Sequence, residues 1–145
     1  MNTEPAVNTY LISEPFDRAL KTIRETLTRN DLNVATELDV AARVKRELNI
    51  GFAPCRILLV DSPLLMLESA TVDCAACVLL PLHLVVSGRG PQTQVHWMTP
   101  AAIDGLRLPA GAALPLARLQ GQVSRALERV AMRRDIYQAA ATNAK

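Results

Sequence analysis

The sequence predicts an α+β domain in which helices pack on one face of a mainly antiparallel sheet. The expected elements run in the order strand, helix, several strands, helix. Two stretches repeat apolar residues at helical spacing, and strand-like runs with turn signals lie between them. The chain has 145 residues, half of them hydrophobic, which suits one domain with a substantial core. We therefore expect a single domain over 1–145, with an ordered core at about 7–138 and a flexible C-terminal tail.

The N-terminal part predicts a strand, a helix and a second strand. Residues 7–13 read as the first strand, and a helix over 15–29 follows, with Ser13 at its N-cap and a proline in its first turn. Residues 32–39 alternate as a half-buried strand does. The apolar stripe of the helix is Phe16, Ala19, Leu20, Ile23 and Leu27. One face of the second strand would carry Val34, Thr36 and Leu38.

The middle of the chain predicts a short helix over 40–49, a strand over 52–63 and one or two helical turns over 64–70. The runs "CVLLPLHLVVS" (77–87) and "TQVHWMT" (93–99) flank "GRGP", which is a hairpin signal.

A Pro- and Gly-rich crossing then leads to a final helix over 115–138. Its apolar stripe is Leu116, Leu119, Val123, Ala126, Leu127 and Val130. From all elements together, the predicted core contains Leu20, Ile23, Leu27, Ile57, Leu84, Trp97, Leu119, Val123 and Leu127.

Three motifs in order, "TELDVAARVKREL", "CRILLVDSP" and "LLPLHLVV", resemble the bacterial family catalogued as domain of unknown function 302. The resemblance covers roughly residues 8–131. It implies a fold of the TATA-binding-protein type, which is a curved antiparallel sheet backed by two longer helices. The positions that match the family pattern are Glu37, Asp39, Lys45, Arg56, Pro63 and Pro81.

The sequence departs from this family at its two usual cysteines. The Arg-Ile-Leu strand ends in Asp61-Ser62-Pro63 where the family typically has Cys-Asn-Pro, and Leu82 stands where a cysteine usually follows the proline. Some members occur in sulfur- or metal-related gene contexts, which suggests a thiol- or metal-handling role. The role of the usual cysteine pair does not carry over to this chain.

Cys74 and Cys77 form a C-x-x-C that invites a thiol or metal interpretation. A redox pair needs its first cysteine at a helix N-terminus, whereas Cys77 is predicted to open a strand. A closed zinc site needs four ligands, and Cys55 and His83 could complete the set only on paper. We favour a turn that leads into the strand, with both cysteines acting as small hydrophobic residues. No cofactor is expected, and metal binding stays the alternative.

The predicted hairpin places two histidines opposite each other. If Gly88 pairs with Pro91, then His83 faces His96 across neighbouring strands at about 5 Å between Cβ atoms. The pair could ligate a metal, bind an anion or repel when protonated. The alternative is two partly exposed histidines without a ligand, and a shift of two residues would leave them diagonal.

The strand predicted at 78–86 is apolar on both faces, so its open face needs a cover. Val78, Leu80 and Val85 would point away from the core side. We expect a homodimer through this face, with a cover from within the chain as the alternative. The predicted ligand or interface residues are His83, Val85, His96, Glu37, Lys45 and Asp61, the last from its place at a strand end.

Composition narrows the remaining classes of function. A net charge of +2 gives no reason to expect binding to nucleic acid or an anionic membrane. No apolar run reaches the roughly 18 residues of a membrane span, and the N-terminus does not resemble a secretory signal. Three cysteines argue against a disulfide framework, so we expect a cytoplasmic protein. Hydrolase and phosphate-binding motifs are lacking, so the sequence does not support an enzyme.

Overall fold

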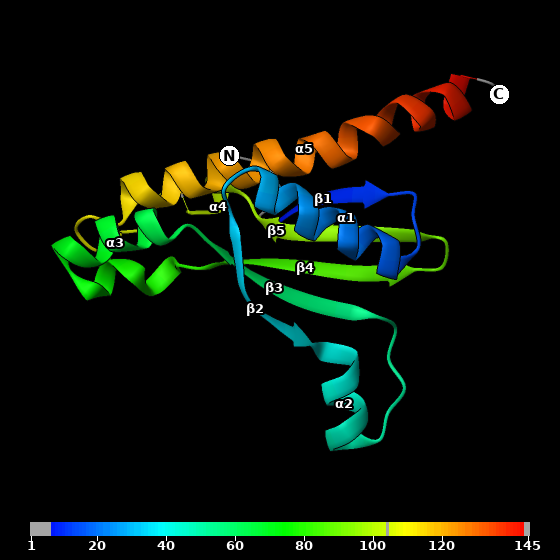
Figure 1. Ribbon diagram of the computed structural model, residues 1–145, viewed down its shortest axis with the longest axis horizontal. Helices are drawn as coiled ribbons and strands as arrows, with labels where there is room; N and C mark the ends of the chain where they lie inside the picture. The colour runs from blue at the N-terminus through cyan, green and yellow to red at the C-terminus, as the bar shows by residue number, and fades with distance from the viewer. Residues whose placement is uncertain (1–6, 104, 144–145) are drawn as a thin grey trace.

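The computed structural model describes residues 7–103 and 105–143 as five strands and their connecting helices. The sheet is antiparallel throughout, in the order β1-β5-β4-β3-β2 (Figure 1). The strands are β1 (Val7–Ile12), β2 (Asn33–Asp39), β3 (Cys55–Asp61), β4 (Leu82–Arg89) and β5 (Gln92–Met98). The helices are α1 (Phe16–Arg29), α2 (Val40–Leu48), α3 (Pro63–Val72), the 3₁₀ helix η1 (Cys74–Leu79), α4 (Pro100–Ile103) and α5 (Ala113–Asn143). The predicted α+β class is confirmed.

The core lies between the sheet and two helices, α1 and α5. Both helices bury apolar residues at helical spacing, and they contact each other over the same face of the sheet. Each large aliphatic side chain buried there contributes roughly 1.5–3 kcal/mol. The core residues of the helices are Ala19, Leu20, Ile23, Leu27, Leu116, Leu119, Val123, Ala126, Leu127 and Val130. The strands contribute Ile12, Leu58, Val60, Leu82, Leu84, Val86, Val95 and Trp97.

The prediction that Ile57 lies in the core is wrong. Leu58 pairs with Leu84 and Leu59 with His83, so the side chains facing the helices are Leu58 and Val60. Ile57 is half-buried on the other face. The run "ILLV" (57–60) is apolar at four consecutive positions, so alternation does not tell which of its side chains face the core.

Two helix ends differ from the predicted ones. Pro15, not Ser13, is the N-cap residue of α1, and no side chain caps this end. The final helix begins earlier than predicted and extends beyond residue 138, to Asn143. At α2, Asp39 is an ordinary N-cap, since its carboxylate accepts a hydrogen bond from the Ala42 N–H at 2.9 Å.

A bulge in β2 overturns the predicted alternation of that strand. Val34 pairs with Val60, and the next pair is Thr36 with Leu59, so Ala35 is the extra residue. Val34 therefore lies on the helix side, whereas Thr36 and Leu38 lie on the opposite face, where Leu38 is 42% exposed.

The hairpin register is shifted by two residues from the prediction. Arg89 pairs with Gln92 across the two-residue turn Gly90-Pro91, and Gly90 has a φ of 61°. Glycine at this first turn position adopts positive φ without a Cβ clash, and proline fixes the second position. As a result Val85 pairs with His96, and His83 is not opposite His96.

The segment around the C-x-x-C is helical and not the start of a strand. Cys74 and Cys77 both lie in η1, and β4 begins only at Leu82, after a cis peptide bond between Leu80 and Pro81. Val78 is 69% exposed and Leu80 is buried, so the two do not share an open sheet face as predicted.

Candidate functional site

The packing leaves the sheet face opposite α1 and α5 without a helix over it, and we call it the open face. Its side chains alternate with those of the core along every strand. Its large apolar side chains are partly shielded by their neighbours at Leu11, Ile57, Leu59 and Val85, whereas Val7, Leu38 and Met98 are 42–53% exposed. The residues of the open face are Val7, Thr9, Leu11, Thr36, Leu38, Cys55, Ile57, Leu59, Asp61, His83, Val85, Ser87, Gln94, His96 and Met98.

The sheet forks at one end of this face, between β4 and β5. Pairing between these strands ends at Val85 and His96. Beyond that point β4 stays paired with β3 as far as Leu82, and β5 stays paired with β1 as far as Met98. The space between the separated strands is a cavity of about 450 Å³, which we call the fork groove.

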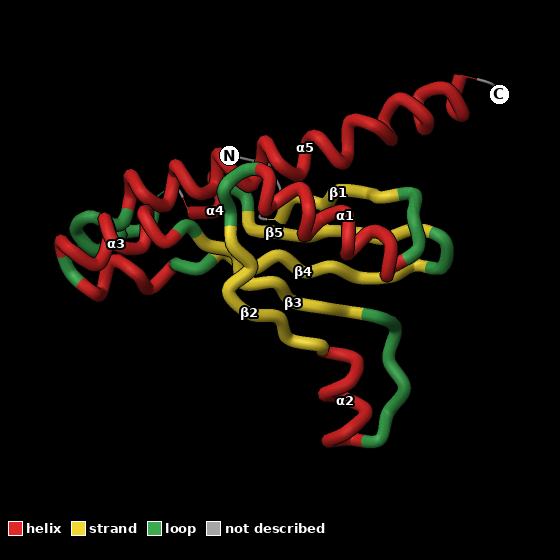
Figure 2. The backbone as a smooth tube through the Cα atoms, viewed as in Figure 1, coloured by secondary structure: helices red, strands yellow, loops and turns green. Residues whose placement is uncertain are grey.

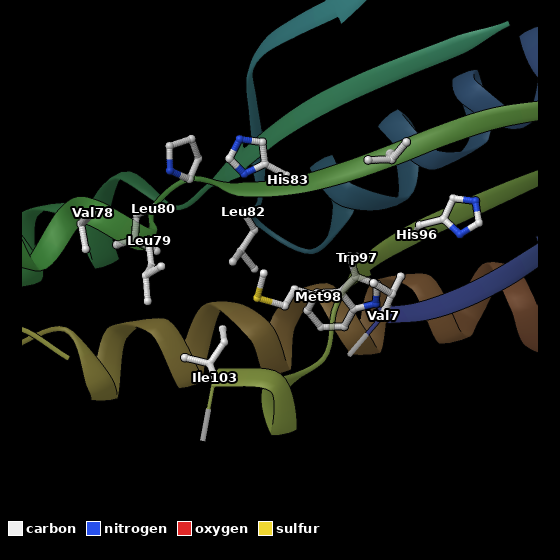
Figure 3. A pocket seen from close by; sticks show the side chains of 12 residues that line it. Val7, Val78, Leu79, Leu80, Leu82, His83, His96, Trp97, Met98 and Ile103 are labelled. Carbon is white, nitrogen blue, oxygen red and sulfur yellow. The ribbon is translucent and has the colours of Figure 1, made fainter. Parts of the chain in front are cut away.

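The walls of the fork groove come from η1, β4, β5 and α4, with Val7 of β1 and the Leu80-Pro81 connection beside them. Figure 3 shows Leu79 and Leu82 extending from the η1 and β4 side, with Met98 and Ile103 approaching from β5 and α4. The ring of Trp97 forms part of the wall beside Met98 and is 3% exposed. Of the described residues that line the groove, none is Lys, Arg, Asp or Glu. Its interior is therefore apolar and reaches from the open face to core side chains.

The two histidines stand on the open face beside the fork groove. His96 is held between two hydroxyl groups, with Thr9 Oγ1 at 2.9 Å from Nδ1 and Ser87 Oγ at 3.4 Å from Nε2. A serine–histidine contact without a carboxylate on the other ring nitrogen lacks the third member of a nucleophilic triad. His83 is exposed and pairs with Leu59 of β3.

Glu37 lies on the other side of the sheet, in a network of ion pairs. Its carboxylate accepts hydrogen bonds from Nε and Nη2 of Arg24, and Arg56 Nη1 lies 3.4 Å away. The Arg24 hydrogen bonds and the charge of both guanidinium groups hold the pKa of Glu37 below its ordinary value, against the opposing effect of burial. Arg56 also donates to Asp39 at 3.0 Å. Glu37 therefore ties β2 to α1 and β3.

The other predicted site residues lie apart from one another. Lys45 is exposed on α2, and Asp61 ends β3 opposite Asn33, where burial raises the pKa of its carboxyl group. The three cysteines are free; burial, followed by the charge of Asp39, raises the pKa of Cys55. Cys74 is exposed, and Cys77 Sγ lies 3.9 Å from the Met66 carbonyl oxygen. Among the side chains that the structure describes, no three from His, Cys, Asp or Glu gather as a metal site.

The structure thus brings together three of the predicted residues, His83, Val85 and His96, around the fork groove. Sequence reasoning missed the groove itself. Trp97 and Leu82 read as ordinary core residues, and no sequence signal marks the point where the pairing of two strands ends.

A family model described as "Domain of unknown function DUF302" matches residues 8–130. The chain belongs to this family. The crystal structure of an uncharacterized conserved DUF302 protein from Bacillus stearothermophilus is similar, with a TM-score of 0.75 and 18% sequence identity. The similarity covers 88% of this chain and 99% of that one, and at this identity it shows the fold alone. A search of curated proteins found no match. None of the described helices is both long enough and apolar enough to cross a membrane.

Proposed function

We propose that this DUF302 protein is a non-catalytic binding and interaction module of the cytoplasm that works as a homodimer through its open face. The observation that carries the proposal is the uncovered sheet face opposite α1 and α5, with at least one apolar side chain on each of the five strands. Three free thiols support a reducing compartment.

The size of the open face suits a second copy of the chain. Five strands at the usual spacing, each about six residues long, span roughly 24 Å by 20 Å. A standard interface buries about 800 Å² on each partner, so this footprint of roughly 480 Å² supplies somewhat more than half of it, and neighbouring surface must supply the rest. A two-fold axis would bring the same residues of both copies together, so one apolar patch can cover the other.

The arm formed by α2 and the loop after it adds apolar surface for the same partner. The arm extends away from the sheet at the β2–β3 end (Figure 2). No residue of α2 is fully buried, although the helix is amphipathic. Leu48, Ile50 and Phe52 are 54–65% exposed. In a dimer these side chains lose solvent contact, which stabilises association by about 25 cal/mol per Å².

Val85→Asp tests the proposal because Val85 sits at the centre of the open face, between Ile57 and His96. Multi-angle light scattering of the wild type at tens of micromolar is expected to give the dimer mass, and the variant should give the monomer mass. Leu64→Asp is the matched control, since Leu64 is 63% exposed on α3 and should leave the dimer intact.

Far-UV circular dichroism establishes that each variant is folded. Leu38→Asp lies at a more exposed site on the same face, so it gives a second test that should destabilise the folded monomer less than Val85→Asp. A wild type that is monomeric at this concentration would contradict the proposal.

A thiol- or metal-handling role is the second candidate, and one observation favours it. Side chains three residues apart in a 3₁₀ helix lie on the same side, so η1 places Cys74 above Cys77. Thiol titration and metal analysis of protein purified without oxygen test this role. Stoichiometric metal that disappears in Cys74→Ser would support it, and metal-free protein would exclude the metal form.

A further inference from the structure

We propose that the fork groove binds a small, uncharged hydrophobic molecule that carries one hydrogen-bond acceptor, such as a ketone or an ester. The site and its ligand go beyond the proposed dimer and rest on separate observations. These are the depth of the groove, the absence of charged groups among the described residues that line it, and one buried donor.

The depth of the groove favours a small molecule over a folded partner. Its volume of about 450 Å³ lies within the usual range for small-molecule sites. The groove passes between two strands and ends on the core residues Leu82, Trp97 and Ile103, which are 3–8% exposed. A folded partner lies across a sheet face and does not enter such a gap, whereas a slender apolar molecule fits between the strands.

The lining favours an uncharged ligand. The titratable side chains among the described lining residues are His83 and His96, and both stand on the open face at the mouth. His96 is already held by Thr9 and Ser87. A charged group placed among Leu79, Leu82 and the other apolar side chains would lose its hydration without gaining a counter-ion.

Trp97 favours an acceptor on the ligand. Its indole N–H is buried and has no hydrogen-bond partner in the part of the chain that the structure describes. An unsatisfied buried donor is costly, and an acceptor from the ligand would remove that cost. In Figure 3 the nitrogen edge of the ring is turned toward Val7, the first residue of β1. Because the nitrogen is fully buried, an acceptor in the groove reaches it only after a neighbouring side chain moves.

Trp97 also reports on binding, because it is the single tryptophan of the chain. Tryptophan emission is followed while the protein is titrated with methyl heptyl ketone and, separately, with nonanoate, which has the same number of carbons. The ketone is expected to give a saturable change, with nonanoate binding at least about tenfold more weakly because its charge is desolvated. No saturable change with the ketone, or equal or tighter binding of nonanoate, would overturn the proposal.

Two variants locate the site. Met98 is 53% exposed and its side chain lies beside Trp97 in the groove, so Met98→Asp introduces a carboxylate at little cost to the fold. It should weaken ketone binding at least about tenfold, whereas Leu64→Asp outside the groove should not. Equal weakening by both variants would show that the ketone binds elsewhere.

Isothermal titration calorimetry of Trp97→Phe isolates the indole N–H. This variant should bind the ketone several-fold more weakly, and unchanged affinity would refute the hydrogen bond to the acceptor. Ketone binding by a protein that light scattering shows to be monomeric would refute the dimer and leave the groove proposal standing.

Discussion

Glu37→Gln separates a structural role of Glu37 from the ligand or interface role that the sequence suggests. The substitution keeps the size of the side chain and removes its charge. In the wild type the carboxylate receives two hydrogen bonds from Arg24 and lies 3.4 Å from Arg56 Nη1. The glutamine amide would retain one acceptor and direct an NH₂ group at a guanidinium group.

The loss of stability expected for Glu37→Gln depends on how exposed the three side chains are. The side chains of Arg24, Glu37 and Arg56 are 40%, 24% and 25% exposed. Hydrogen bonds to buried charged groups contribute about 1.5–3 kcal/mol, and exposed pairs contribute about 0.2–1 kcal/mol. For this half-exposed network we expect a loss of about 1–2 kcal/mol in the free energy of unfolding at pH 7.

The pH dependence has a definite sign. The hydrogen bonds from Arg24 lower the pKa of Glu37 in the folded state from an ordinary value of 4.5. Its stabilising effect is therefore complete above pH 4.5 and is lost as the pH falls through the lower, folded-state value. The difference in stability between wild type and Glu37→Gln should thus be smaller at about pH 3 than at pH 7.

Urea unfolding at both pH values, at one protein concentration, measures this difference. Glu47→Gln is the control, because Glu47 is exposed on α2 and pairs with the equally exposed Arg46 at 3.4 Å. It should cost no more than about 0.5 kcal/mol. If Glu37→Gln behaves like the control at pH 7, or if its deficit persists unchanged in acid, Glu37 does not act through this network.

Two further predictions concern glycines and Asp61. Gly111→Ala and Gly105→Ala both place a side chain at positive φ, which costs about 1–2 kcal/mol each. The new Cβ at position 111 would also lie 2.6 Å from Val72 Cβ, whereas the new Cβ at position 105 would meet no described atom within 4 Å. Urea unfolding should therefore show Gly111→Ala to be less stable by at least about a further 1 kcal/mol, and equal losses would disprove the contact. Asp61→Asn should raise the urea midpoint at pH 7, because burial raises the pKa of Asp61 and its ionised form opposes folding. That gain should vanish below the ordinary pKa of 3.8, and a variant less stable than wild type at pH 7 would show that the carboxylate has a stabilising partner.

The long helices were predictable from the sequence. A buried helix face repeats apolar residues at helical spacing, and this repeat is recognisable even when the first and last residues of the helix are misplaced. The stripes on α1 and α5 are buried as expected apart from the half-buried Phe16, although both helices begin at residues other than the predicted ones. The C-x-x-C segment was not predictable in this way. Its run from Cys77 to Val86 is apolar almost throughout, so periodicity could not separate η1 from β4.

Whether a predicted site residue lies on the expected face of the sheet depends on the size of the register error in its strand. Side chains alternate with a period of two, so the two-residue shift in the hairpin changed partners and kept faces. His83, Val85 and His96 therefore remain on the open face, although the two histidines are no longer opposite each other.

The bulge in β2 has the opposite consequence, because it adds a single residue at Ala35. An odd shift exchanges the two faces for every residue that follows it. With Val34 on the helix side, an unbroken strand would have turned Glu37 away from α1, and the bulge instead brings Glu37 to Arg24. One unpaired residue thus moves Glu37 from the face where we place the partner and ligand to the face where it holds the fold together.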